Sequence, residues 1–204
     1  MKKGRIGIGL LIGLGVVLLV IIGAGWYISG VNRVVRMEET VKGAWSQVET
    51  VLQRRIDLIP NLVSTVKGYA SHEKGLFTEI TKLRSQWGQA STKKEKIAAA
   101  GGLEGTISRL LLVAENYPNL KANENFLTLQ AQLEGTENRI SVERMRYNQA
   151  ARDFNAYIRT VFGSFFARKR NLSALPYFEA DVFVSNSRQR AEIVSFSEGL
   201  IISA

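Results

Sequence analysis

The chain has 204 residues, a formal net charge of +9 and no cysteine, and its length suits one domain plus an anchor. The absence of cysteine excludes a disulfide framework, a thiolate metal site and a cysteine nucleophile. The basic excess is spread along glutamate-rich segments without a zinc-finger or RNA-binding pattern, so we exclude nucleic acid as a partner and assign the excess to a surface near anionic lipid.

An uninterrupted apolar segment predicts a single transmembrane helix over residues 6–29. It contains 24 residues without a charged side chain, and at about 1.5 Å per residue this suffices to cross a hydrocarbon core of about 30 Å. Trp26 and Tyr27 fall at its far end, where aromatic rings settle among lipid headgroups. A cleaved signal peptide is the alternative, but the run is too long and Ser29-Gly30-Val31 is a poor cleavage site.

The charges beside this segment predict its orientation. Three basic residues and no acidic residue precede it, whereas Arg33 and Arg36 behind it are followed at once by Glu38 and Glu39. Because positive flanks stay in the cytoplasm, we expect residues 1–5 to be cytoplasmic. The remaining chain would then be periplasmic or otherwise extracytoplasmic, held in the inner (cytoplasmic) membrane by one pass.

The first long amphipathic helix is predicted from Val41 to Tyr69, where apolar residues recur every three or four positions. Pro60 lies inside it. The apolar period continues in phase on both sides of this proline, which predicts a kink rather than an end.

Two shorter helices and a second long one are predicted downstream. The first covers about 72–90, with Ser71 as its N-cap and a connector at 88–94. Gly101-Gly102 then interrupts the chain before a helix that starts at Leu103 and ends at the turn Asn116–Asn119. The second long helix is predicted over 123–165.

These elements predict an all-α fold. The N-terminal transmembrane helix is followed over residues 30–170 by an antiparallel bundle of two long and two shorter helices. Residues 171–204 form a short, partly extended tail, whose apolar runs favour short strands or contacts between subunits, with an unstructured end as the alternative.

Several sequence blocks resemble the LemA family, namely Ala44–Glu49, Arg54–Val63, Thr65–Glu73, Glu115–Phe126, Leu133–Ile140 and Arg146–Asn148. The blocks fall within residues 31–165, and their combined order is highly specific. The resemblance implies an N-terminal anchor, a bundle of long helices and an extracytoplasmic envelope protein without known enzymatic activity. Many relatives carry a proline-containing segment where this chain has 161–166, and the tail beyond Arg170 matches only loosely.

No catalytic, cofactor-binding or metal-ligating residue is predicted. His72-Glu73 lacks the second histidine of a zinc motif, so we interpret it as a surface pair at a helix start. Two polar groups are expected to face each other across the long helices and to fix their register rather than to bind an anion: Arg54, Arg55, Asp57 and Asn61 on one, and Glu137, Asn138, Arg139 and Arg144 on the other.

The basic run Arg168, Lys169 and Arg170 is a candidate lipid-headgroup contact. In an antiparallel bundle the last helix returns toward the membrane that the first helix leaves. A solvated turn is the alternative interpretation.

The sequence therefore predicts a non-enzymatic, membrane-anchored helical scaffold or adaptor of the bacterial cell envelope. The lipid bilayer, further copies of the chain and unidentified envelope proteins are its expected partners. Two alternatives remain open: a regulatory partner of a membrane protease or transporter, and an enzyme with a carboxylate-based metal site among the helices.

Overall fold

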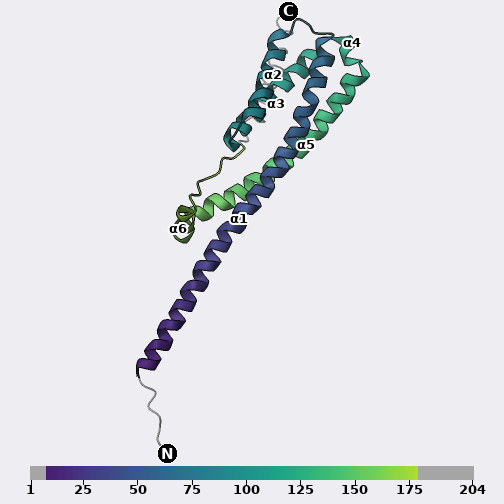
Figure 1. Cartoon of the computed structure of the whole chain (residues 1–204). Coiled ribbons are helices and arrows are strands. Elements are labelled where there is room, and N and C mark those ends of the chain that lie inside the picture. The colour runs from purple at the N-terminus through teal and green to yellow at the C-terminus, as the bar shows by residue number, and fades with distance from the viewer. Residues whose placement is uncertain (1–7, 179–204) are drawn as a thin grey trace, which may run out of the picture. The chain divides into compact units, whose positions relative to one another are not determined.

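The computed structural model describes residues 8–178, and all regular secondary structure in this range is helical (Figure 1). The all-α prediction is therefore confirmed for these residues. The predicted cytoplasmic residues 1–5 and the tail residues 179–204 lie outside the described residues. The helices are α1 (Ile8–Lys67), α2 (Lys74–Gln89), α3 (Lys93–Ala114), α4 (Pro118–Lys121), α5 (Glu124–Arg159) and α6 (Val161–Lys169).

The described residues form two compact units. The first unit takes in the chain up to Ser46 together with Gln149–Leu175, and the second takes in Gln47–Asn148 and the segment that begins at Pro176. Both α1 and α5 therefore contribute one part to each unit.

The predicted transmembrane segment is the first part of α1, a helix of 60 residues that continues through Pro60. Its large apolar side chains between Leu10 and Ile22 are 54–70% exposed. A helix this apolar, exposed on all its faces, is typical of a segment that lies in lipid. By length and composition α3 is also apolar enough to cross a membrane, but its Leu103, Ile107 and Leu110 are buried in the second unit, as in a core helix.

The predicted helix over about 72–90 is present as α2, but its predicted N-cap is wrong, and so is the predicted start of the next helix. Helix α2 begins at Lys74 after Glu73, without a side-chain cap, and not after Ser71. Helix α3 begins at Lys93, well before Leu103. Its N-cap is Thr92, whose hydroxyl accepts a hydrogen bond from the Glu95 backbone N–H, while the Glu95 carboxylate accepts from the Thr92 backbone N–H in return. The hydrogen bonds that the Glu95 carboxylate accepts from the backbone N–H groups of Thr92 and Ser91 lower the pKa of Glu95.

The predicted interruption at Gly101-Gly102 is also wrong, because both glycines lie inside α3. A Cβ atom built on Gly102 would lie 2.8 Å from Cδ2 of Leu83 in α2. The missing side chain therefore lets α2 and α3 pack closely, and this contact outweighs the weak helix propensity of glycine.

The second long helix is shorter than the predicted range 123–165, because it ends at Arg159. Thr160 is extended and caps α6: its side-chain oxygen accepts a hydrogen bond from the Gly163 backbone N–H at 3.0 Å. A Cβ atom at position 163 would lie 2.0 Å from the Tyr157 carbonyl oxygen, so the tight turn requires glycine there.

In the second unit, α1 and α5 run antiparallel. Asn123 at the start of α5 donates a hydrogen bond to the Tyr69 hydroxyl just beyond α1, and further along the pair Arg55 of α1 contacts Glu137 of α5. Helices α2 and α3 pack on each other, and the Trp87 indole of α2 donates a hydrogen bond to the α1 residue Gln53. Fully buried side chains from these helices form the core: Ile59, Leu62, Ile80, Ile107, Leu110, Leu133, Ile140 and Tyr147.

Residues 172–178 follow α6 without regular secondary structure, and asparagine side chains hold them. In the second unit the Asn148 amide donates to the Phe178 carbonyl at 2.8 Å and accepts from the Phe178 N–H at 2.9 Å. In the first unit Asn155 makes the same pair of bonds with Leu175. Each amide thereby pairs with a backbone as a neighbouring strand would.

The Tyr147 phenol is buried in the second unit, donates a hydrogen bond to the Pro176 carbonyl, and gives the stability of that unit a dependence on alkaline pH. Burial, aided by the charge of Tyr177, raises the pKa of Tyr147 from 10.0 to about 12. The protonated phenol therefore stabilises the fold below pH 10, and this contribution is lost as the pH rises from about 10 to 12.

We expect the free energy of unfolding to fall by about 2–3 kcal/mol over this range. Tyr147→Phe should unfold more readily at neutral pH, by about 1 kcal/mol for the lost hydrogen bond, but should show a flatter alkaline dependence. Denaturant unfolding of the full chain in detergent as a function of pH measures both effects. Tyr117→Phe is the matched control and should keep the slope of the unmodified chain; an equally steep slope for Tyr147→Phe would contradict the assignment.

Candidate functional site

Four charged side chains gather inside the second unit, and we call Arg55, Glu104, Glu137 and Arg144 the ionic cluster. Arg55 of α1 forms an ion pair with Glu137 of α5, and Arg144 of α5 donates from Nη2 to Oε2 of Glu104 in α3 at 2.8 Å. The four side chains are only 10–25% exposed. Two positive and two negative charges balance, so the cluster has no net charge with which to attract an anion.

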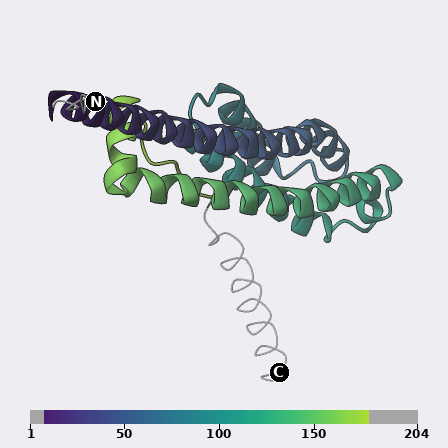
Figure 2. The ribbon, with the colours of Figure 1, turned by 90° about the horizontal axis from the view of Figure 1, so that it is seen from below.

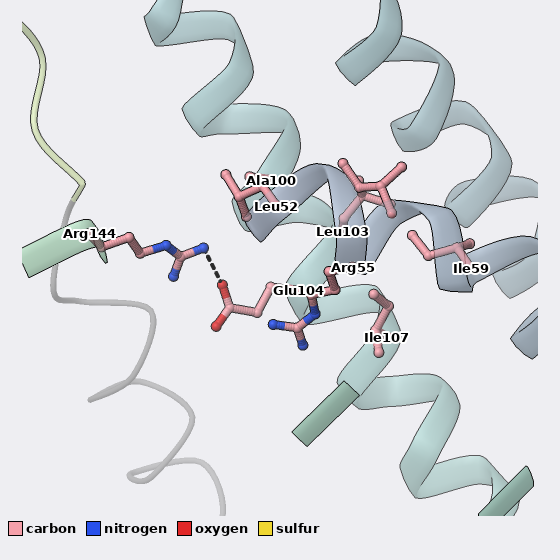
Figure 3. A pocket seen from close by; sticks show the side chains of 9 residues that line it. Leu52, Arg55, Ile59, Ala100, Leu103, Glu104, Ile107 and Arg144 are labelled. Carbon is pink, nitrogen blue, oxygen red and sulfur yellow. Dashed lines mark hydrogen bonds and ion pairs between the residues drawn. The ribbon is translucent and has the colours of Figure 1, made fainter. Parts of the chain in front are cut away.

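Three members of the ionic cluster, Arg55, Glu104 and Arg144, line a small pocket between α1, α3 and α5. Figure 3 shows the Arg144 and Glu104 side chains pointing toward each other, with the Arg55 guanidinium beside Glu104. Apolar side chains form the rest of the wall: Leu52, Ile56, Ile59, Ala100, Leu103 and Ile107. In these surroundings an ion pair is weakly screened, and losing one partner leaves the other charge buried alone.

Part of the predicted polar contact between the long helices is present. Arg55, Glu137 and Arg144 belong to the ionic cluster, whereas five predicted members are exposed: Arg54, Asp57, Asn61, Asn138 and Arg139. Sequence reasoning missed Glu104, because only the two long helices were considered as partners. Its signal was available, since Glu104 lies among Ala100, Leu103 and Ile107 on the apolar stripe of α3.

A second cluster, in the first unit, surrounds the far end of the apolar part of α1, and we call it the aromatic cluster. The Trp26 ring centroid lies 5.5 Å from that of Phe162 and 5.4 Å from that of Phe166, and the Tyr27 ring lies 5.7 Å from Phe166. Gly30 makes room for α6, since a Cβ there would lie 2.2 Å from Phe166 Cε2. The aromatic residues that end the predicted span thus pack directly on α6.

The predicted lipid-contact residues Arg168, Lys169 and Arg170 are exposed at the C-terminal end of α6. The Lys169 ammonium lies 4.9 Å from the Tyr27 ring centroid. Arg170 Nη2 lies 3.1 Å from Glu38 Oε2. Arg168 lines a shallow surface pocket with Val161, Ser164, Phe165 and Lys169.

The Glu38–Arg170 pair is an electrostatic contact between α1 and the end of α6. Burial alone would raise the pKa of Glu38, but hydrogen bonds from Lys42 and Arg170 outweigh it and lower that pKa. The carboxylate is therefore charged at neutral pH and available to hold Arg170. Among exposed side chains such a pair contributes at most about 1 kcal/mol.

Over residues 8–178 there is no group of three or more His, Cys, Asp or Glu side chains that could hold a metal ion. His72, the one histidine of the chain, is exposed in the turn between α1 and α2.

The ionic cluster predicts a specific mutational pattern. We expect Glu104→Leu alone to destabilise the fold by about 3–5 kcal/mol, because it leaves Arg144 buried without a counter-ion. The double variant Glu104→Leu with Arg144→Met should recover most of this loss, since no unpaired charge remains. Chemical unfolding of the full chain in detergent measures the cycle.

Arg54→Ala is the control, because Arg54 is exposed beside the cluster and its loss should change stability by less than about 0.5 kcal/mol. If the double variant is no more stable than Glu104→Leu, the two side chains are not held as a pair.

Comparison with known proteins identifies the family of the chain. The model of the LemA family matches residues 44–196. Protein LemA of Metamycoplasma hominis is 24% identical over 155 residues, which cover 76% of this chain and 71% of that protein. Magnetosome protein MamQ 2 of Paramagnetospirillum magneticum is 26% identical over 153 residues, and magnetosome protein MamQ of Magnetospirillum gryphiswaldense is 24% identical; both alignments cover 62% of this chain and 56% of the relative. The resemblance seen in the sequence blocks is thus confirmed, and the chain, a membrane-associated helical protein, belongs to the LemA family.

Proposed function

We propose that the chain is a non-enzymatic scaffold or adaptor of the cell envelope, anchored in the membrane by α1. The supporting observation is that one continuous helix supplies both an exposed apolar segment and part of a packed core. The charged side chains of the ionic cluster, inside the second unit, form ion pairs with one another. None of the names of the relatives reported above contains an enzymatic activity.

The proposed topology is a single pass through the inner membrane, with residues 1–5 in the cytoplasm and the second unit outside it. The basic residues that precede the span support this orientation. Arg33 and Arg36 follow the span, but Glu38 and Glu39 offset them.

We further propose that the chain assembles with copies of itself. Large apolar side chains stay exposed on the second unit, among them Leu112, Leu127, Val142 and Met145. The sequence beyond residue 178 adds further apolar and aromatic residues. Val142 and Met145 lie one turn apart on α5, and neighbouring exposed apolar side chains are typical of protein contacts.

Single cysteines test the topology cleanly, because the natural sequence has none. Gly43→Cys is exposed on α1 with open space around it, and Lys3→Cys lies on the other side of the predicted span. In spheroplasts, a membrane-impermeant maleimide should label position 43 and should label position 3 only after the membrane is opened. Both variants should stay in the membrane pellet after alkaline carbonate extraction.

Release by carbonate would contradict the anchor, and labelling of position 3 alone in closed spheroplasts would reverse the orientation. Met145→Cys, treated in the same membranes with a bifunctional maleimide, should give a species of twice the chain mass. Cross-linking only to other proteins would favour the adaptor or regulatory role over self-assembly.

A further inference from the structure

Helix α6 exposes large apolar side chains on its outward face. Val161, Phe162 and Phe165 are 82%, 61% and 51% exposed, while Gly163, Phe166 and Ala167 on the other side are buried. Three neighbouring large apolar side chains on so short a helix form an exposed patch, and such patches mark interaction surfaces.

We propose that α6 is an in-plane docking helix whose outward face inserts into the headgroup region of an anionic phospholipid leaflet, beside the point where α1 leaves the bilayer. This proposal rests on the anchoring of α1 proposed above. The docking of α6 adds a second attachment to the membrane, besides the spanning helix α1.

The contacts of α6 fix which of its sides faces the span. Phe162 packs on Trp26, and Lys169 lies over the Tyr27 ring. Arg170, on another side of the helix, pairs with Glu38. Glu38 lies about 18 Å beyond Trp26 along α1, at 1.5 Å per residue. The side with Phe162 and Lys169 is therefore directed along α1 toward its N-terminal, apolar part.

The direction of α6 also suits a membrane surface. Figure 2 shows α6 crossing α1 rather than running along it, and the crossing is at Gly30 and Phe166. A helix that runs across a spanning helix, rather than along it, lies closer to the plane of the bilayer than to its normal. Since Trp26 and Tyr27 mark the headgroup level, α6 is positioned at that depth.

The charges complement an anionic leaflet. Arg159, at the end of α5 just before α6, and Arg168 and Lys169, at the end of α6, are exposed. Their long stems can lie along the apolar face while the charges reach lipid phosphates. Apolar residues combined with arginine and lysine on one exposed face are typical of interfacial helices.

The alternative occupant is a second copy of the chain. Lipid is favoured because the patch is continuous with the aromatic cluster at the end of the span, where the adjoining phase is the bilayer itself. The test below gives a different result for each occupant.

The test uses the full chain with a single cysteine, Val161→Cys, carrying an environment-sensitive nitrobenzoxadiazole label. The chain is reconstituted into vesicles of phosphatidylcholine and phosphatidylglycerol, at a high ratio of lipid to protein, with a spin-labelled lipid as quencher. We expect blue-shifted emission and strong quenching at position 161. Gly43→Cys, about 25 Å beyond Trp26 along α1, is the matched control and should be neither shifted nor quenched.

Replacing Arg168 and Lys169 by glutamine tests the electrostatic part. Each basic residue lost should weaken docking about fivefold in anionic vesicles, hence about 25-fold for the pair, with little change in pure phosphatidylcholine. Both positions are exposed, so helix content measured by circular dichroism should stay the same.

Three outcomes would overturn the proposal: a position-161 label as water-exposed as that at position 43, an unchanged docked fraction in the glutamine variant, and quenching by a spin label on another copy of the chain but not by lipid. Flotation of the same vesicles separates this from failure of the anchor. A chain that does not float with the lipid contradicts the proposed function, whereas a floating chain with a water-exposed label contradicts only the docking of α6.

Discussion

The structure depends on the two different chemistries of α1. In its first part, apolar side chains cover all faces and are exposed, as between Leu10 and Ile22. In its second part, one stripe is buried in the core, with Val48, Ile59 and Leu62 among its members. Leaving a large apolar side chain in water costs about 1.5–3 kcal/mol, so the first part is stable only where lipid replaces water. A continuous helix with these two parts is typical of a chain that is anchored in a membrane.

In the second unit, specific contacts hold α1 and α5 in one register. Apolar stripes alone tolerate sliding by a turn, because each turn presents a similar face. The ionic cluster does not, since Arg55 must meet Glu137 and Arg144 must meet Glu104. Such buried pairs add little net stability, but a shifted register would leave their charges unpaired.

Much of the fold could be predicted from helical periodicity and from the lengths of the apolar and amphipathic segments. The apolar run over 6–29, the continuation through Pro60 and the helical pattern after Asn123 could all be predicted because each depends on local sequence. Gly101-Gly102 misled because the reason for glycine is a contact with Leu83, a residue of another helix. The end of α5 was missed because the apolar spacing continues across Thr160, while the break depends on the cap that Thr160 forms with Gly163.

The candidate sites were predictable only in part, for a related reason. The basic run Arg168–Arg170 and the aromatic pair Trp26-Tyr27 are visible in the sequence, but nothing in their spacing says that α6 packs on α1 at Gly30, beside this aromatic pair. Glu104 and the amide of Asn148 act on partners 40 and 30 residues away. Such contacts are set by the packing of whole helices, which a single sequence does not reveal.

The most direct measurement is a spin-label accessibility scan along α1 of the full chain in lipid vesicles, with one cysteine at a time from position 10 to position 46. We expect labels at 10–22 to be accessible to oxygen and shielded from an aqueous nickel complex on every face of the helix. Beyond Arg33, accessibility to the aqueous reagent should return with a period of 3.6 residues. A 3.6-residue period of aqueous accessibility within 10–22 would show that this part of α1 packs on protein at a water interface, and would contradict the membrane assignment.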